Sequence, residues 1–299
     1  MEAQVATRPS RRKIIRPLLI IIVLIIIISL FLTFFSINPR DYAYSIAREI
    51  TRARVLQEFS EWELLTSSNF EIYYDSDDAA AGTLVLEAAK SIYQPVVEIL
   101  DFEPPQATAI VVHPTQQGLA ESFGWSSPAE GAMGVYWAGV VQILSPSTWL
   151  PSGNPKRQAM LFLENGPVTH EFAHVVIDYK ARGNYPRWLS EGIAQYIEYK
   201  LHGVIWLGPQ ASFDQTLYTI NELEDFYRLE NRSLAYRQAL SIVLYIVETY
   251  GEEYLPLLLS ELGAGSNFDA ALTKVINCSL LQLEANWLNW VAADSKRWH

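Results

Sequence analysis

The part of this chain that decides its fold is residues 168–179, which read VTHEFAHVVIDY. Apolar side chains recur in this stretch at the spacing of an α-helix, which predicts that Phe172 and Val175 face a core. Side chains four residues apart lie on one face of a helix, about one turn from each other. We therefore expect His170 and His174 to stand side by side on this helix.

Two imidazoles one turn apart are suited to binding a metal ion. Zinc accepts imidazole nitrogen at about 2.0–2.1 Å, and a catalytic zinc site keeps one coordination position for water. Glu171 directly follows His170, so it does not join the same ligand set easily but can reach a metal-bound water. The metal lowers the pKa of that water, and Glu171 is expected to take its proton as the general base.

A third metal ligand is expected from the segment that follows. Residues 188–196 read WLSEGIAQY, and Pro186 is suited to the start of a helix there. Glu191 could complete a ligand set of two histidines and one carboxylate, which favours zinc. The alternative is that His170 and His174 are surface histidines and Glu191 is an exposed helix carboxylate. That alternative predicts nothing about the flanking residues.

The two segments together resemble those of the gluzincin metallopeptidases, a group within the MA clan of peptidases. In gluzincins an H-E-x-x-H helix is completed by a glutamate on the next helix, and residues 188–196 look like the W-L-x-E-G-x-A-x-Y helix of the aminopeptidase-like branch. The resemblance implies that His170, His174 and Glu191 bind zinc and that Glu171 is the catalytic base. It also implies a zincin-like catalytic domain.

A weaker resemblance extends over roughly residues 70–290. In related enzymes a tyrosine from the later region donates a hydrogen bond to the tetrahedral oxyanion, and by this analogy Tyr236 is the candidate. Such a donor can contribute a few kcal/mol to transition-state stabilisation. The alternative is that Tyr236 only packs against its neighbours.

Residues 131–135 read GAMGV and are similar to the G-A-M-E-N strand of zinc aminopeptidases. In those enzymes the glutamate holds the free amine of the substrate, whereas this chain has Gly134. The difference favours an endopeptidase over an exopeptidase, unless the three matching letters are a coincidence. Residues 139–144 could form a strand that lines the substrate cleft, and an extended peptide could pair with its backbone.

Two other polar side chains are interpreted as structural. His113 ends a predicted strand before Pro114 and has no ligand spacing. Asp178 lies four residues beyond His174 and could orient a metal ligand. We interpret it instead as a solvated helix carboxylate.

The first forty residues differ in character from the rest of the chain. Residues 18–37 are almost wholly apolar, and about 20 helical residues span roughly 30 Å, the thickness of a bilayer core. Residues 1–17 form a basic tail, and positive flanks tend to stay in the cytoplasm. We expect a single-pass anchor with the N-terminus cytoplasmic and the catalytic domain extracytoplasmic. The alternative is a cleaved signal peptide, although residues 34–39 make a poor cleavage site.

Composition narrows the possible partners of the remaining chain. Residues 41–299 carry 16 basic and 32 acidic side chains, which argues against binding nucleic acid. Cys278 is the single cysteine, so no intrachain disulfide can form. The expected partners are a peptide or protein substrate and, through the anchor, the lipid bilayer.

The order of predicted elements indicates an α+β fold. Strands are predicted at residues 70–74, 109–112 and 134–144, the last interrupted at Gly139, and a helix is predicted at 79–100. From residue 155 onward the pattern is mainly helical. We expect residues 38–62 to be a stalk or linker helix and residues 63–299 to form the metallopeptidase domain, with a mixed-sheet lobe and a helical lobe.

The leading hypothesis is a membrane-anchored zinc peptidase. One alternative is a catalytically silent metal-binding scaffold or peptide-binding protein on a peptidase fold. Another is a zinc hydrolase that acts on non-peptide bonds, because the metal chemistry alone does not name the substrate.

Overall fold

The computed structural model describes residues 22–23, 39–125, 133–151, 153–205, 208, 210–294 and 297. The chain divides into two compact units, residues 1–43 and 44–299. The predicted anchor at residues 18–37 lies outside the described residues, apart from Ile22 and Val23. Among the helices that the structure describes, none is long and apolar enough to cross a membrane.

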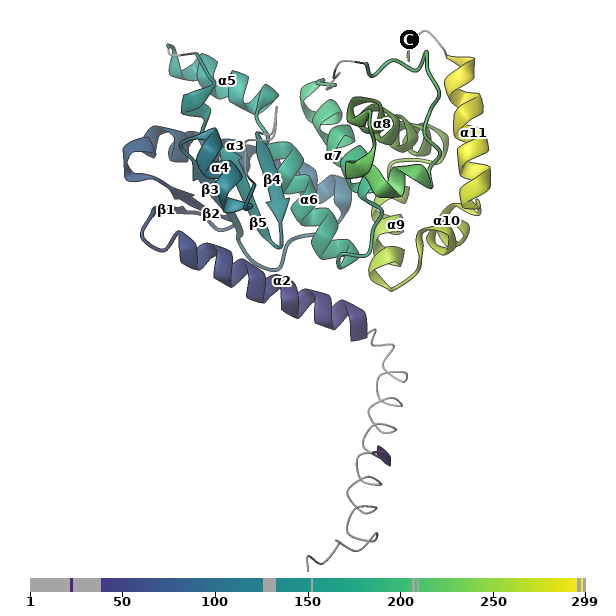
Figure 1. The fold of residues 1–299 in the computed structure, drawn as a ribbon, viewed down its shortest axis with the longest axis horizontal. Helices are drawn as coiled ribbons and strands as arrows, with labels where there is room; N and C mark the ends of the chain where they lie inside the picture. The colour runs from purple at the N-terminus through teal and green to yellow at the C-terminus, as the bar shows by residue number, and fades with distance from the viewer. Residues whose placement is uncertain are drawn as a thin grey trace, which may run out of the picture. The chain divides into compact units, whose positions relative to one another are not determined.

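The second unit contains a five-stranded mixed sheet in the order β1-β2-β3-β5-β4 (Figure 1). The inner strands β2, β3 and β5 run parallel, and the edge strands β1 and β4 are antiparallel to their neighbours. The strands are β1 Glu63–Thr66, β2 Phe70–Tyr74, β3 Thr108–His113, β4 Gly134–Trp137 and β5 Val140–Leu144.

The parallel part of the sheet follows from its sequence pattern. Parallel strands need a crossover, and helix α3 (Ala79–Leu100) supplies the one between β2 and β3. Strands β3 and β5 are buried along their whole lengths, which agrees with their continuous apolar runs. The predicted strand at 70–74, the helix at 79–100 and the interruption at Gly139 are all confirmed.

The prediction that a peptide pairs with residues 139–144 is wrong. Strand β5 (Val140–Leu144) is already paired with β3 on one side and with β4 on the other. Its backbone groups are therefore used within the sheet. Strand β4 ends the sheet order on this side, and no other strand that the structure describes pairs with its outer edge.

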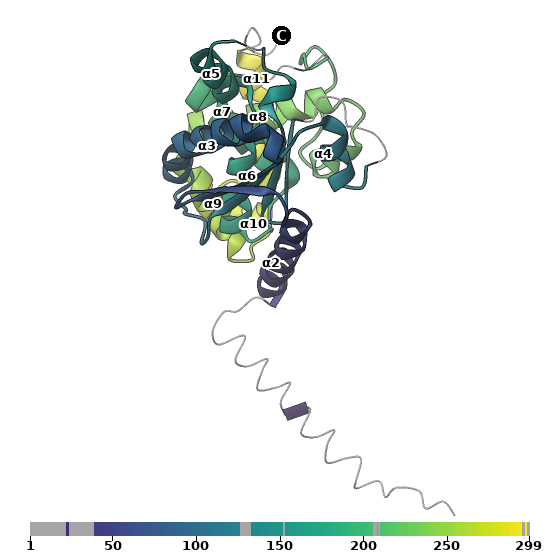
Figure 2. The same ribbon diagram turned by 90° about the vertical axis from the view of Figure 1, so that its left-hand side faces the viewer.

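Helices form the rest of the second unit and share one apolar core with the sheet. Helix α6 contacts both the sheet and α7, and α7 in turn packs on α8. Helix α6 therefore lies between the sheet and α7 (Figure 1; Figure 2 gives the view after a 90° turn). The predicted α+β class, with strands first and helices after, is confirmed. The further helices are α4 Gln116–Ser122, α5 Pro155–Asn165, α6 Val168–Ala181, α7 Arg187–His202, α8 Arg232–Thr249, α9 Tyr254–Gly263, α10 Phe268–Ile276 and α11 Leu280–Ala293.

Helix α2 (Pro39–Glu58) occupies most of the segment that was predicted as a stalk or linker. From Tyr44 onward it belongs to the same compact unit as the sheet. Val55, Leu56 and the nearby Phe59 pack on the sheet face opposite to the main core. The C-terminal part of α2 thus contributes to the packing of the second unit.

Candidate metal centre

Two antiparallel helices joined by a short connection build the site. Helix α6 ends at Ala181 and is followed by Arg182 in the left-handed conformation with φ 52°, and α7 begins after the extended Pro186, as predicted. At Gly192, a Cβ would lie 2.4 Å from the carbonyl oxygen of Ala239. Only glycine permits α7 to approach α8 this closely, and this contact fixes the position of the adjacent Glu191.

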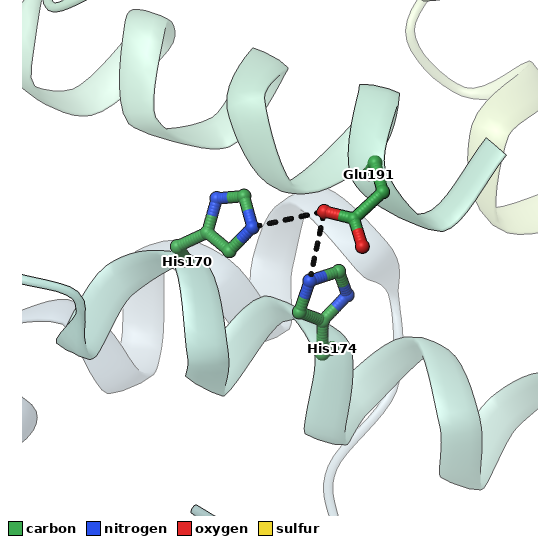
Figure 3. Close-up of side chains that lie close together, drawn as sticks. All are labelled: His170, His174 and Glu191. Carbon is green, nitrogen blue, oxygen red and sulfur yellow. Dashed lines mark hydrogen bonds and ion pairs between the residues drawn. The ribbon is translucent and has the colours of Figure 1, made fainter. Parts of the chain in front are cut away.

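The structure brings the three predicted metal ligands together (Figure 3). The Nε2 atom of His170 lies 3.2 Å from Oε2 of Glu191, and Nε2 of His174 lies 3.4 Å from the same oxygen. One ligand atom from each residue lies within 4.8 Å of the others. The imidazole rings stand 4.7 Å apart with their planes at 83°. Two nitrogens and one oxygen therefore converge on a common point.

The outer nitrogen of each imidazole has its own partner on α7. The Nδ1 atom of His170 lies 2.8 Å from Oε2 of Glu198, and Nδ1 of His174 lies 2.7 Å from Oγ of Ser190. These contacts orient the two rings with Nε2 toward the common point. Sequence reasoning missed both partners. Glu198 could have been found because it lies seven residues, or two helical turns, beyond Glu191.

The electrostatics of the cluster favour a cation. Burial acts to lower the pKa of His170, but the carboxylates of Glu198 and Glu191 outweigh it and raise that pKa well above the usual range. Burial acts to raise the pKa of Glu191, but His174 and His170 lower it below the usual range. The imidazole nitrogens and the carboxylate are a donor set that zinc accepts, so the residues fit the predicted metal.

Glu171, the predicted base, is buried beside the cluster with 6% of its surface exposed. Burial raises its pKa, while the neighbouring His170 and His174 act to lower it. A Cβ at Gly134 would stand 2.9 Å from Cγ of Glu171. The missing side chain at Gly134 therefore lets the edge strand β4 pass directly beside this carboxylate.

Tyr236, the predicted oxyanion donor, lies on α8. Its ring packs edge-to-face against Phe226 with the centroids 4.9 Å apart. Its carbonyl oxygen accepts a hydrogen bond from Nε2 of Gln195 at 3.0 Å. These contacts hold the tyrosine in the helical part of the unit, and its catalytic role stays a prediction.

Asp178 is a correction to the sequence-based interpretation. It is not solvated, because none of its surface is exposed. Its partners are not the metal ligands but donors from α2, β4 and the loop after α6. His113, interpreted as structural, is buried in β3 with Nε2 2.7 Å from Oε1 of Gln142.

Comparison with known proteins assigns part of the chain to a family. Residues 156–293 match the family described as the Peptidase MA superfamily. The match runs from α5 into α11 and includes both helices of the metal centre. No match was found among curated proteins. The assignment to the MA clan, made above from residues 168–196, is confirmed.

Proposed function

We propose, from the Peptidase MA superfamily domain formed by residues 156–293, that this chain is a zinc-dependent metallopeptidase. The observation that carries the proposal is the convergence of His170, His174 and Glu191 on one point, with the buried Glu171 beside it. This arrangement contains a ligand set for the metal and a carboxylate base, the groups that activate water in metal-assisted peptide hydrolysis.

His170, His174 and Glu191 would hold the zinc ion. When bound there, zinc would acidify a water molecule and polarise the carbonyl of the scissile peptide bond. Glu171 accepts a proton from the attacking water and returns it to the nitrogen of the leaving amine. Its raised pKa suits this exchange, because the carboxyl group must hold the proton between the two transfers.

The edge strand β4 (Gly134–Trp137) is the element that would hold an extended peptide. It lies at the end of the sheet order, and its first residue is adjacent to Glu171. A peptide that adds to this edge by backbone hydrogen bonds would pass alongside the base. Because Gly134 offers no carboxylate to bind a free amine, we propose cleavage at internal bonds.

The location of the enzyme is part of the same proposal. Residues 18–37 would anchor it in a membrane, with residues 1–17 in the cytoplasm and the catalytic unit on the other side. The apolar run and its basic flank in the sequence support this orientation.

The test is cleavage of a diverse peptide library by the full chain, purified in detergent and loaded with zinc. We expect internal cuts, including cuts in peptides with acetylated amino termini. Activity should disappear with a chelator, return with added zinc and be absent in Glu171→Gln. Glu87→Gln, an exposed glutamate on α3, is the matched control and should keep full activity.

Three outcomes would contradict the proposal. Folded protein that takes up no zinc would remove the metal site. Zinc-loaded protein that cuts no peptide would favour the silent scaffold or a hydrolase of other bonds. Cleavage that persists in Glu171→Gln would remove this residue as the base.

A further inference from the structure

Asp178 is the most heavily hydrogen-bonded carboxylate described on the metal-binding helix. Its Oδ1 accepts from the hydroxyls of Tyr44 at 2.6 Å and Tyr185 at 3.2 Å. Its Oδ2 accepts from Nη1 of Arg48 at 3.0 Å and from the hydroxyl of Tyr136 at 2.8 Å. This Asp178 cluster joins α2, β4 and the loop after α6 to one side chain.

Such a carboxylate is costly to bury without compensation. Asp178 lies in the last turn of α6, where the helix dipole disfavours negative charge. The Arg48 guanidinium supplies the opposite charge and stacks 3.6 Å from the centroid of the Tyr179 ring. Burial and the charge of Asp178 raise the pKa of Tyr136 and of Tyr185, so both hydroxyls remain protonated donors.

The hydroxyl of Tyr136 also controls the turn between β4 and β5. It accepts a hydrogen bond from the backbone N–H of Gly139 at 3.1 Å. Ala138 and Gly139 adopt φ angles of 48° and 85°, in the left-handed region. Because this conformation is sterically unfavourable for Ala138, the turn needs stabilisation by contacts with other residues. The link from Asp178 through Tyr136 to Gly139 supplies it.

Strand β4 is therefore attached to α6 at two places. At its first residue, Gly134 passes beside Glu171, and at its third residue, Tyr136 bonds Asp178. Residues two apart on a strand face the same side, so both contacts hold one face of β4 against α6. These two contacts therefore fix the distance between the backbone of β4 and the Glu171 carboxylate.

We infer that Asp178 and Tyr136 are positioning residues that fix the edge strand β4 beside Glu171, with Tyr44 and Arg48 of α2 completing the attachment. The inference rests on the proposed function, because it assigns β4 to peptide binding. It makes α2 part of the substrate-binding apparatus and not only a connector. A loss of these contacts should weaken peptide binding more than the chemical step.

Tyr136→Phe in the full chain tests the inference with the smallest possible change. We expect KM to rise about tenfold, the equivalent of one hydrogen bond to a charged group, with kcat changed less than about threefold. Zinc affinity should stay within about twofold. Amide hydrogen exchange of residues 134–140 should become about tenfold faster. The matched control is Tyr73→Phe, a tyrosine on β2, because β2 does not pair with β4.

Arg48 extends the test to α2. Arg48→Met should speed exchange in residues 134–140 as Tyr136→Phe does, and Arg48→Lys should restore part of the protection because it restores the positive charge. Exchange rates in Tyr136→Phe equal to those in Tyr73→Phe would overturn the inference. So would a fall in kcat at unchanged KM. Exchange is measured without substrate, so it tests the attachment even if no peptide is cleaved and the proposed function fails.

Discussion

Glu171 and Asp178 are two buried carboxylates seven residues apart on α6, and their surroundings are opposite. Asp178 accepts four hydrogen bonds and faces an arginine. For the Glu171 side chain, no hydrogen bond to another described residue is found; it lies near the two histidines of its own helix and beside the backbone of Gly134. Under the proposed function, one helix would supply both a catalytic base and a structural carboxylate. A carboxylate without donors keeps a raised pKa for proton transfer, and a saturated one fixes neighbouring elements.

Among the variants that test this comparison, Glu171→Gln should have the largest effect, and the effect is on kcat. We expect kcat to fall by about 10³-fold, since the general base is lost. Zinc content should be unchanged. A Glu with a raised folded pKa loses stability as pH rises from its unfolded pKa through its folded one. At pH 7 the neutral amide should therefore raise the Tm of the metal-free protein. A lower Tm would show that Glu171 is a structural carboxylate like Asp178.

Arg48→Met should affect stability instead of chemistry. Leaving Asp178 buried without its cation should lower the free energy of unfolding by about 3 kcal/mol, read from the urea midpoint at constant slope. The double variant Arg48→Met/Asp178→Asn should recover most of this loss. Lys90→Met removes an exposed partner of Glu87 and should change stability by less than about 1 kcal/mol. A loss equal to that of the control would mean that the buried pair is not a stabilising contact.

Glu198→Gln and Ser190→Ala test the contacts that orient the histidines. Loss of either partner should weaken zinc affinity by about 10–100-fold, because these groups hold the rings in place. The fold should stay intact, as judged by circular dichroism. Glu98→Gln on α3 is an exposed control and should bind zinc normally. Zinc affinity unchanged in both test variants would mean that packing alone orients the imidazoles.

The smallest effect is expected from substitution of His113, which forms a polar pair with Gln142 inside the sheet. Burial lowers its pKa, and the hydrogen bond to Gln142 opposes this only in part. As pH falls through about 6.5, the unfolded chain takes up a proton that the folded state resists, so stability falls. In metal-free protein, His113→Gln should show a shallower loss of stability between pH 7.5 and 5.5. Identical slopes would show that His113 does not resist protonation.

Much of the metal centre could be predicted from the sequence because its residues are close along the chain. His170 and His174 are one turn apart, and Glu191 follows on the next helix. Helical periodicity fixes which side chains share a face, so spacing alone indicates a ligand set. The alternation of apolar runs and turns likewise placed β2, β3, the β4–β5 pair and α3 correctly, but it missed the edge strand β1 (Glu63–Thr66).

The open edge of the sheet and the Asp178 cluster could not be predicted in this way. Strand order depends on how distant segments pair, and the interpretation of residues 139–144 as the peptide-binding strand was wrong for that reason. Tyr44 lies 134 residues from Asp178, Arg48 lies 130 residues away and Tyr136 lies 42 residues away. No local pattern connects these positions, so Asp178 was wrongly interpreted as solvated.

The sequence by itself therefore predicted the two helices of the candidate metal centre, the three candidate ligands and the resemblance to the MA clan that residues 156–293 confirm. Each depends on short-range spacing along a regular helix, which a linear pattern records. Only the tertiary structure decided that β4 is an edge strand of the described sheet, that Gly134 brings it against Glu171 and that Asp178 links it to α2. These features depend on long-range packing, in which the partners of a buried charge are chosen by the fold and not by its sequence neighbours.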